Sequence, residues 1–385
     1  MNWNFQNSYT ELPSIYFSNV KPDNYENPQL LLFNSDLANE LNLNISNNDK
    51  EICDFLLGKN QNSKNFFSQA YAGHQFGHFT ILGDGRALIL GEHINQNKTR
   101  FDIQLKGSGQ TPYSRNGDGK ATLGPMIREY IVSEAMHYLN IPSTRALAII
   151  TTGEKILREK FEPGAILVRV AKSHIRVGTF QFGSLLKNKK EFKNLINYTI
   201  DRLFPEIKNN ENKYLVFFRK TCELQIKLIV EWMRVGFIHG VMNTDNMALS
   251  GETIDYGPCA FMDHYDPLTV FSSIDHQGRY SYVNQPIIIQ WNLARLAESI
   301  LPLIGKDLDK SMKLAEEAIN TFADLYKSKW LDMMRLKIGL STTDISFNIS
   351  TTLFKTSTPS SFLLKNSLPL YIKVIFNLSP FSKNF

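Results

Sequence analysis

The hydrophobic and polar positions change character along the chain, from strand-like patterns to helical ones. Between residues 70 and 170, glycine-rich turns alternate with short apolar runs. In residues 100–106, apolar and polar residues alternate and place Phe101, Ile103 and Leu105 on one face, which is the period of a β-strand. Further strands are predicted at residues 87–90, 147–152 and 165–170, the second of them ending at a Thr-Gly turn.

One helix is predicted among these strands, and helices dominate after them. Pro125 suits a first helical turn, and Glu129 lies near the start of the same helix. Four apolar residues recur at every fourth position and give this helix one apolar face. They are Ile127, Ile131, Ala135 and Leu139. Beyond about residue 187 the candidate helices are 214–236, which ends at a glycine, 291–304 and 311–325.

These patterns divide the chain into four parts. Residues 1–65 are polar and Asn-rich and are interpreted as an N-terminal extension. Residues 66–187 form a β-rich lobe with one helix, and residues 188–340 form a helical lobe, so the predicted fold class is α+β. In residues 341–385 the helical periodicity stops, and no acidic residue follows Asp344. This atypical tail is either a poorly ordered polar segment or a lost or altered C-terminal region.

The composition is that of an ordinary globular protein. Of the 385 residues, 43% are hydrophobic and 21% are charged, which excludes disorder or a fibrous repeat as the main description. The 42 Lys and Arg residues against 37 Asp and Glu residues give a net charge of +5. This mild basicity suits a phosphate-rich small ligand equally well and does not by itself imply nucleic acid. We therefore expect no nucleic-acid partner.

The cysteines and the hydrophobic runs bear on location. Cys53, Cys222 and Cys259 are far apart and form no Cys-x-x-Cys pair, which argues against a disulfide scaffold or a zinc ribbon and favours a reducing compartment. The N-terminus lacks a basic start followed by an apolar run, and no stretch approaches the roughly 18 apolar residues of a membrane span. We expect a cytoplasmic protein without a membrane partner.

A glycine-rich turn precedes the strand predicted at residue 87. Gly83, Asp84, Gly85 and Arg86 follow one another there. Glycines at such a turn let backbone N–H groups approach a phosphate closely, and arginine adds a cationic fork. An ordinary hairpin turn with a solvated arginine is an equally good interpretation of this segment alone.

A lysine and a glutamate follow in an order that is typical of protein kinases. Lys106 ends the alternating strand on its polar face, where an isolated lysine is more often a solvated edge charge. Residues 114–120 are a second glycine-rich, charged turn that leads into the helix of Glu129. In kinases a strand lysine and a helical glutamate form an ion pair, and the lysine holds nucleotide phosphates.

A second constellation follows the long helix predicted at residues 214–236. It begins at His239 and is followed by Asp255-Tyr-Gly. Kinase catalytic loops place an aspartate two residues after such a histidine and an asparagine seven residues after it. Here these positions hold Val241 and Asn246, so the usual base is absent, and Asp245 is the nearby carboxylate that could replace it. Oxygen ligands from Asn246 and Asp255 suit Mg²⁺ shared with phosphates.

With these segments in place, the chain resembles the selenoprotein O (SelO, also called YdiU) family of pseudokinase-like protein adenylyltransferases. The resemblance covers roughly residues 10 to 340. The segments that carry it are Tyr71-Ala-Gly-His-Gln-Phe-Gly-His78, Leu82-Gly-Asp-Gly-Arg86, Gln104-Leu-Lys-Gly-Ser-Gly-Gln-Thr-Pro-Tyr-Ser-Arg115, Asn116-Gly-Asp-Gly-Lys120, Ile127-Arg-Glu129, 239–247 and Asp255-Tyr-Gly-Pro258.

The resemblance implies a two-lobed, protein-kinase-like fold that transfers AMP from ATP to Ser, Thr or Tyr hydroxyls of proteins and releases pyrophosphate. By matching motifs, the residues that would contact ATP are Gly83, Gly85, Arg86, Lys106, Asp118, Gly119, Arg169, Arg176 and Asp255. Lys106 would also pair with Glu129. Asn246 and Asp255 would bind Mg²⁺ or Mn²⁺, and Asp245 would be the proton acceptor.

Two alternatives remain open at this point. The chain could be a kinase that transfers the γ-phosphoryl group with Asp245 as base, or an inactive nucleotide-binding scaffold. Among the other candidates, His74 and His78 have the i, i+4 spacing of a helical zinc pair, but the neighbouring glycines favour a packing or turn role. His174 is expected to be a solvated loop residue, and Cys259 a small buried one.

Overall fold

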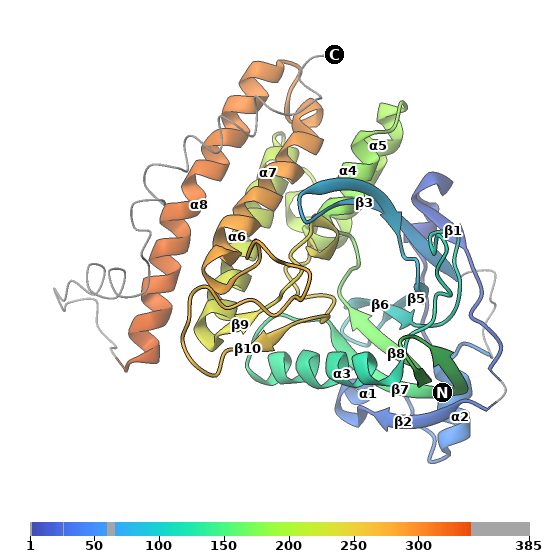
Figure 1. Ribbon diagram of the computed structural model, residues 1–385. Coiled ribbons are helices and arrows are strands. Elements are labelled where there is room, and N and C mark those ends of the chain that lie inside the picture. Colours follow the sequence, from blue (N-terminus) through green and yellow to red (C-terminus); the bar gives the residue numbers. More distant parts are fainter. Residues whose placement is uncertain (1, 26, 60–65, 340–385) are drawn as a thin grey trace.

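An antiparallel sheet is the framework of one half of the molecule (Figure 1). The computed structural model describes residues 2–25, 27–59 and 66–339. Within them, seven strands follow one another in the order β1-β3-β5-β6-β8-β7-β2, and β4 pairs with β3. The strands are β1 (Phe17–Asn19), β2 (Gln29–Phe33), β3 (Phe67–Gln75), β4 (His78–Gly83), β5 (Ala87–Ile94), β6 (Arg100–Lys106), β7 (Arg145–Leu157) and β8 (Phe161–Ala171).

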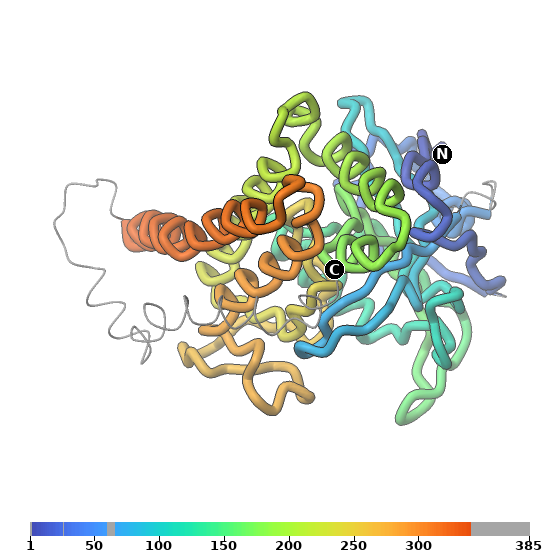
Figure 2. Tube along the Cα trace, turned by 90° about the horizontal axis from the view of Figure 1, so that it is seen from above, coloured from blue at the N-terminus to red at the C-terminus, as the bar shows by residue number. Residues whose placement is uncertain are grey.

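Helices make up most of the other half, together with a two-stranded ribbon of β9 (Phe237–Ile238) and β10 (Ala260–Phe261). The helices of this half are α4 (Val177–Ser184), α5 (Lys189–Leu203), α6 (Lys213–Val235), α7 (Gln285–Ile304) and α8 (Leu308–Lys337), whereas α1 (Ser35–Glu40), α2 (Asp49–Leu56) and α3 (Leu123–Tyr138) lie with the sheet. Seen from above, α8 extends away from the sheet (Figure 2). The predicted α+β class is confirmed.

The two faces of the sheet have different partners. Apolar residues of α1 and α2 pack with Ile103 and Leu105 of β6 and with apolar residues of β7 and β8. The opposite face of β6 carries Asp102, Gln104 and Lys106, and all three are buried as well. Helices α6, α7 and α8 pack on one another, and α4 contacts both β3 and α7. The polar face of β6 is therefore enclosed between the sheet and the helices.

Local signals explain several of the helix ends. The side chain of Asn34 accepts a hydrogen bond from the backbone N–H of Leu37 at the start of α1, and Asp307 does the same for Lys310 at the start of α8. Gly236 ends α6 in the left-handed conformation, with φ +70°. The helix predicted at residues 214–236 is thus confirmed, including its glycine end.

The strand boundaries agree with the sequence in part. Strand β6 has the predicted bounds, and β5 begins where predicted. The predicted turn at Gly153 is wrong as an end of β7, because the strand continues to Leu157 through an irregular register between Thr151 and Lys155. This bulge accommodates the left-handed conformation of Gly153, with φ +78°, and the pairing with β8 continues beyond it.

The buried face of α3 differs from the predicted one. Ile131 and Leu139, which belong to the apolar repeat, are 58% and 39% exposed. Met126, Glu129 and Met136 are at most 2% exposed instead. Glu129 pairs with a buried arginine and a buried lysine. These ion pairs turn the face of α3 that carries Glu129 inward, although the apolar repeat predicted another face. The tail predicted for residues 341–385 lies outside the described residues.

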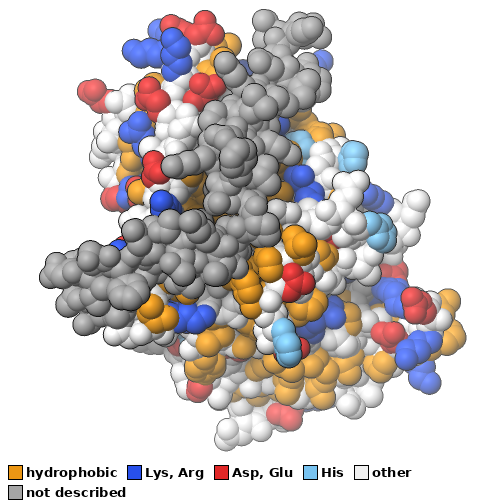
Figure 3. Space-filling model, turned by 60° about the vertical axis from the view of Figure 1, so that its left-hand side comes forward, with side chains coloured by type: hydrophobic (Ala, Val, Ile, Leu, Met, Phe, Trp, Pro, Cys, Tyr) orange, Lys and Arg blue, Asp and Glu red, His pale blue; other side chains and the backbone are white. Residues whose placement is uncertain are grey.

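The helical half contains one long apolar helix and, before it, several exposed apolar side chains. One described segment, Tyr282–Ile304, is by length and composition alone able to span a membrane, but 61% of its apolar window is buried in the protein, as in an ordinary core helix. Large apolar side chains are exposed in the segment before it, among them Tyr265, Leu268 and Ile274. Figure 3 shows hydrophobic side chains gathered on one face of the molecule.

Candidate active site

A cavity of about 860 Å³ lies between the sheet and the helical half. Residues from strands β3, β5, β6 and β8 line it on one side, and residues of the loops after α6 line it on the other. The sequence-predicted residues in its wall are Gly83, Gly85, Arg86, Lys106, Asp118, Gly119, Arg169, Arg176, Asp245, Asn246 and Asp255. Glu129 is not part of the wall and lies behind Lys106, to which it is bonded.

The first glycine-rich turn is packed so closely that a side chain would not fit. A Cβ at Gly83 would lie 2.3 Å from the ring of Tyr113, and one at Gly85 would lie 2.7 Å from the backbone oxygen of Tyr113. The hydroxyl of Thr111 donates to the carbonyl of Asp84 at 2.7 Å and ties the two loops together. The turn is therefore a rigid backbone wall of the cavity.

Arg86 follows this turn and is exposed in the cavity wall. Of the cations in the described part of the wall, Arg86 is the one for which no carboxylate lies within ion-pair distance. A guanidinium in this state is available to an anionic ligand such as a phosphate.

Lys106, Glu129, Arg169 and Asp255 form an ion cluster at the cavity, in which the first three residues are buried and Asp255 is half-buried. The Nζ of Lys106 donates to Glu129 at 2.7 Å and also to Asp255. The Nε of Arg169 donates to Glu129 at 2.8 Å. The side chain of Lys106 is 7% exposed, which excludes the alternative of a solvated edge charge.

The cluster keeps its carboxylates ionised. Burial by itself raises the pKa of Asp255, but Lys106 and Arg169 hold the pKa well below its usual range. Burial lowers the pKa of Lys106, and the two carboxylates beside it oppose this effect. Asp255 also has a left-handed backbone, with φ +66°, which aspartate tolerates better than most residues. The loop thus presents a charged carboxylate to the cavity.

Residues of the second glycine-rich turn also line the cavity. Both oxygens of Asp118 accept from Arg158, at 2.8 and 3.0 Å, and these hydrogen bonds lower the pKa of Asp118. A Cβ at Gly119 would lie 2.0 Å from the backbone oxygen of Gly109. Lys120 donates to Glu154 at 2.9 and 3.0 Å, so its charge is already balanced. The turn is held by its own ion pairs.

Arg176 connects the first turn to the loop of Asp245. Its guanidinium lies 4.3 Å from the centre of the Tyr71 ring and donates to Asp84 at 3.2 Å. A second nitrogen donates to the backbone oxygen of Asp245 at 3.2 Å. Arg176 is 6% exposed, and it fixes the position of Asp245 relative to the sheet.

Asp245 lies in the short helical turn Thr244–Asn246 and is 6% exposed. Its Oδ1 atom is buried and has no hydrogen-bond partner among the described residues. Burial raises the pKa of Asp245 to about 6, although Arg176 opposes the shift. Asp245 lines the cavity, and a carboxylate there with a pKa near the working pH is suited to accept a proton.

Asn246 follows Asp245 and also reaches the cavity. Its Nδ2 atom donates to the carbonyl of Val241 at 3.0 Å, which leaves the amide oxygen as the atom able to act as an acceptor or ligand. Asn246 and Asp255 thus supply two oxygen donors from two neighbouring loops to one cavity.

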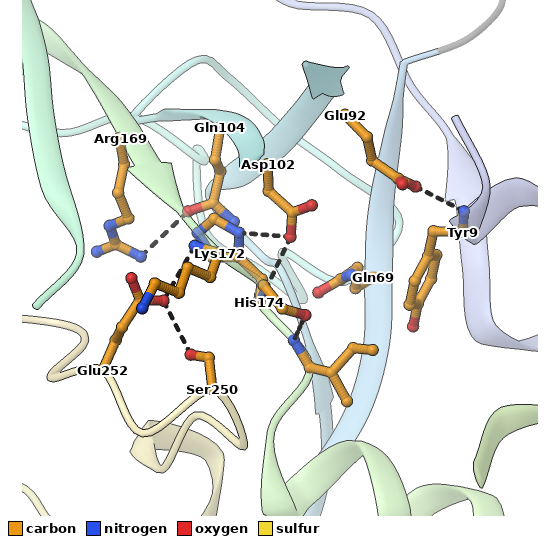
Figure 4. Close-up of polar contacts among 12 residues, drawn as sticks. Tyr9, Gln69, Glu92, Asp102, Gln104, Arg169, Lys172, His174, Ser250 and Glu252 are labelled. Atoms are coloured by element: carbon orange, nitrogen blue, oxygen red, sulfur yellow. Dashed lines mark hydrogen bonds and ion pairs between the residues drawn. The ribbon is translucent and has the colours of Figure 1, made fainter. Parts of the chain in front are cut away.

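A buried polar network lies behind the cavity (Figure 4). His174 is fully buried, and its backbone N–H donates to Asp102 at 2.8 Å, so its predicted solvated position is wrong. Glu252 accepts from the backbone N–H of Lys172 at 3.0 Å, and burial raises its pKa to about 7. Nothing in the sequence indicated that Asp102 and Glu252 belong to this network, although the alternation in β6 placed Asp102 on the same face as Lys106.

The remaining sequence candidates have structural roles. His74 and His78 lie on a hairpin of β3 and β4, where the i, i+4 spacing does not form a helical pair. In the described part of the chain, no three His, Cys, Asp or Glu side chains are grouped as a metal site. Cys259 is 6% exposed, and burial raises its pKa to about 12, which fits the prediction of a buried, unreactive thiol.

Comparison with known proteins identifies the family. The family model described as Protein adenylyltransferase SelO matches residues 1–383, which extends beyond the limit near residue 340 that the motifs indicated. A protein nucleotidyltransferase YdiU of Pelagibacter ubique is 56% identical over 340 residues, which are 88% of this chain and 70% of the relative. The protein of the same name from Brevibacillus brevis is 58% identical over 340 residues, 88% of this chain and 69% of the relative.

A third relative, the protein nucleotidyltransferase YdiU of Halalkalibacterium halodurans, is 58% identical over 341 residues, 88% of this chain and 69% of the relative. The match to the family model and the identity to these relatives both span the residues that form the cavity. The chain therefore belongs to the SelO family of protein adenylyltransferases.

Proposed function

We propose that this protein transfers AMP from ATP to Ser, Thr or Tyr hydroxyls of proteins and releases pyrophosphate. The observation that carries the proposal is the composition of the single cavity described above. One wall offers Arg86, which has no carboxylate of the described residues within ion-pair distance, beside the ion cluster of Lys106 and Arg169, and the other offers the carboxylate of Asp245. Membership of the SelO family, described as protein adenylyltransferases, supports the same reaction.

We also propose that the fold is that of a two-lobed protein kinase. Residues 66–187 would form the nucleotide-binding lobe and residues 188–340 the helical lobe, after an N-terminal extension over residues 1–65. Three features support the proposal. Lys106 of the sheet pairs with Glu129 of a helix, a loop with Asp245 follows the long helix α6, and Asp255 lies in the next loop.

The cavity residues would share the binding of ATP. The backbone of Gly83 and Gly85 would approach the phosphates, and Arg86, Lys106, Arg169 and Arg176 would balance their charge. The outer turn with Asp118 and Gly119 would contact the remainder of the nucleotide. Pyrophosphate is a highly charged leaving group, so this cationic surround would stabilise it as the bond to the α-phosphorus breaks.

Asn246 and Asp255 would hold a divalent cation, Mg²⁺ or Mn²⁺. Two side-chain oxygens together with phosphate oxygens are the usual ligand set of such an ion, and it needs no cluster of three protein ligands. When bound, the ion supplies charge neutralisation on the phosphates.

Asp245 would act on the acceptor. Its carboxylate takes the proton of the incoming hydroxyl while that oxygen bonds to the α-phosphorus and the bond to pyrophosphate breaks. The position two residues after His239, where a kinase has its base, holds Val241, so Asp245 is the carboxylate of this loop that can serve. The reaction would take place in the cytoplasm on protein substrates, without nucleic acid or membrane.

ATP labelled at different phosphates tests the reaction. Incubation of the full chain, Mg²⁺ and casein as a general acceptor protein should transfer label from [α-³²P]ATP and none from [γ-³²P]ATP, with pyrophosphate as the second product. Transfer of γ-label alone would establish a kinase instead. Binding of Mg-ATP in calorimetry without release of pyrophosphate would establish an inactive scaffold.

A further inference from the structure

The hairpin of β3 and β4 reaches from the sheet to the loop of Asp245. Two backbone N–H groups donate hydrogen bonds to that loop, one from β3 and one from the turn that follows it. His74 donates to the hydroxyl of Thr244 at 2.7 Å, and Phe76 donates to the amide oxygen of Asn243 at 3.1 Å. The two residues that precede Asp245 are thus attached to the sheet.

Thr244 belongs to a closed ring of hydrogen bonds. Its hydroxyl accepts from the His74 N–H and donates to the Oε1 of Gln181 in α4 at 2.6 Å. The Nε2 of Gln181 in turn lies 2.7 Å from the Nδ1 of His74. The amide oxygen of Gln181 accepts the proton of Thr244, so the amide nitrogen faces His74 and donates to its Nδ1. Each donor and acceptor of the ring is thereby defined.

The surroundings of the ring keep it in this form. Thr244 is fully buried and Gln181 is 5% exposed. The imidazole of His74 contacts the rings of Phe79 and Trp291 edge-on, each with a centroid distance of 5.1 Å. Burial, together with Arg295, lowers the pKa of His74 to about 4, so its Nδ1 is unprotonated near neutral pH and accepts the bond from Gln181.

Two glycines bring the backbone of these elements against Asp245. A Cβ at Gly73 of β3 would lie 2.2 Å from the free Oδ1 of Asp245. A Cβ at Gly178 of α4 would lie 2.0 Å from the backbone oxygen of Ala72 and 3.3 Å from the Cα of Asp245. Strand β3 and helix α4 therefore pack directly against Asp245, and its Oδ1 lies against the backbone of Gly73.

We propose that His74, Thr244 and Gln181 are positioning residues for Asp245. Their ring fixes the turn that holds the carboxylate of Asp245 in the cavity wall, where the acceptor hydroxyl would meet it. None of the three is assigned a contact with ATP or with the acceptor. The proposal rests on the proposed function, because it assigns these residues to the proton-acceptor step of AMP transfer.

Removal of the ring should slow transfer without weakening nucleotide binding. Thr244→Val keeps the shape of the side chain and removes the hydroxyl, and Gln181→Met removes both hydrogen-bonding groups. Each should lower kcat for α-label transfer to casein by about 10- to 100-fold, since misplacement of a reacting group by about 1 Å costs up to about 10² in rate. The Kd for Mg-ATP should change by less than about twofold, and Thr244→Ser should retain most of the activity.

A double mutant separates positioning from general damage. In an Asp245→Asn background, Thr244→Val should cause no further loss of kcat, because the group that the ring positions is already gone. An equal loss in both backgrounds would overturn the proposal and leave the ring a purely structural role. Thr99→Val, in the exposed turn between β5 and β6, is the matched control and should leave kcat and the melting temperature unchanged.

Hydrogen exchange tests the ring without turnover. The amides of residues 243–246 should exchange faster in Thr244→Val and in Gln181→Met than in the unchanged protein, while peptides of α6 remain unaffected. Unchanged exchange in these amides would overturn the proposal even if the protein transfers no label. If the unchanged protein transfers no α-label and the variants still exchange faster, the proposed function is refuted and the role of the ring in fixing the loop stands.

Discussion

At the scale of single residues, two of the aspartates that line the cavity, Asp245 and Asp255, have opposite ionisation behaviour. Burial raises the pKa of Asp245 to about 6, whereas neighbouring cations hold the pKa of Asp255 well below its usual range. Asp255 bonds to Lys106, while the Oδ1 of Asp245 has no partner among the described residues. Because their environments differ, Asp245 is suited to accept a proton and Asp255 is suited to bind a cation.

The raised pKa of Asp245 predicts the pH dependence of the reaction. The carboxylate must be ionised to accept a proton, so kcat/KM should be full well above pH 6 and fall about tenfold per unit below it, given the pKa of about 6. Asp245→Asn should lower kcat by about 10²- to 10³-fold and abolish this acidic limb. A pH–rate series of α-label transfer measures both effects. An acidic limb that persists in the variant would assign it to another group.

Asp255→Asn should separate metal dependence from nucleotide binding. Asparagine tolerates the left-handed backbone, with φ +66°, but it removes the charge that faces Lys106 and the proposed cation. We expect kcat to fall by at least about 100-fold and the Mg²⁺ concentration for half-maximal activity to rise. Titration of activity with Mg²⁺ at fixed ATP measures both, and an unchanged titration would contradict the assigned role.

At the scale of elements, buried ion pairs decide how α3 is oriented. Glu129 pairs with Lys106 and Arg169, and Glu134 pairs with Arg145, in each case out of contact with bulk water. A buried charge left without its partner costs about 3–5 kcal/mol, which exceeds the gain from burying one more aliphatic side chain. The apolar repeat of α3 therefore faces outward in part, and its glutamates are buried against the sheet.

Two substitutions in α3 should differ sharply in their effect on stability. Met136→Ala removes a fully buried side chain and should lower the free energy of unfolding by about 2–5 kcal/mol. Ile131→Ser, at a position that is 58% exposed, should change it by less than about 1 kcal/mol. Urea unfolding followed by tryptophan fluorescence measures both. The reverse ranking would show that the apolar repeat is the buried face after all.

At the scale of the whole molecule, charged residues join the sheet to the helices. Arg202 of α5 reaches Glu92 at 2.7 Å, bonds to Asp102, and donates to the backbone oxygen of Lys172 at 2.8 Å. Asp102 in turn accepts from the backbone N–H of His174. The cavity is bounded by elements from both halves, so its geometry depends on these connections as well as on its own lining.

Arg202→Leu should therefore destabilise the protein strongly. Glu92 keeps its ion pair with Arg100, but the buried Asp102 loses its arginine partner, at a cost of about 3–5 kcal/mol in the free energy of unfolding. Arg335→Leu is the matched control. It removes an i, i+3 pair with Asp332, which is 61% exposed, and should cost less than about 1 kcal/mol. Equal midpoints of urea unfolding for the two variants would show that the buried network adds no stability.

The sequence by itself determined the strands and helices that carry the site and the identity of its chemical groups. The alternation in residues 100–106, the glycine at the end of α6 and the glycine-rich turns are local signals, and short-range sterics and hydrogen bonds fix them. The motifs also indicated that Lys106 belongs with Glu129, which the structure joins at 2.7 Å.

Only the tertiary structure decided which charges are free and which are already paired. Lys120 pairs with Glu154, and His174 is buried against Asp102. These contacts join segments that are distant in sequence, so residue spacing could not predict them. The environment of Asp245 is of the same kind. Its raised pKa and its free oxygen result from burial by β3 and α4, which lie more than sixty residues away in sequence. Desolvation depends on what surrounds a group in space, and the folded chain alone supplies those surroundings.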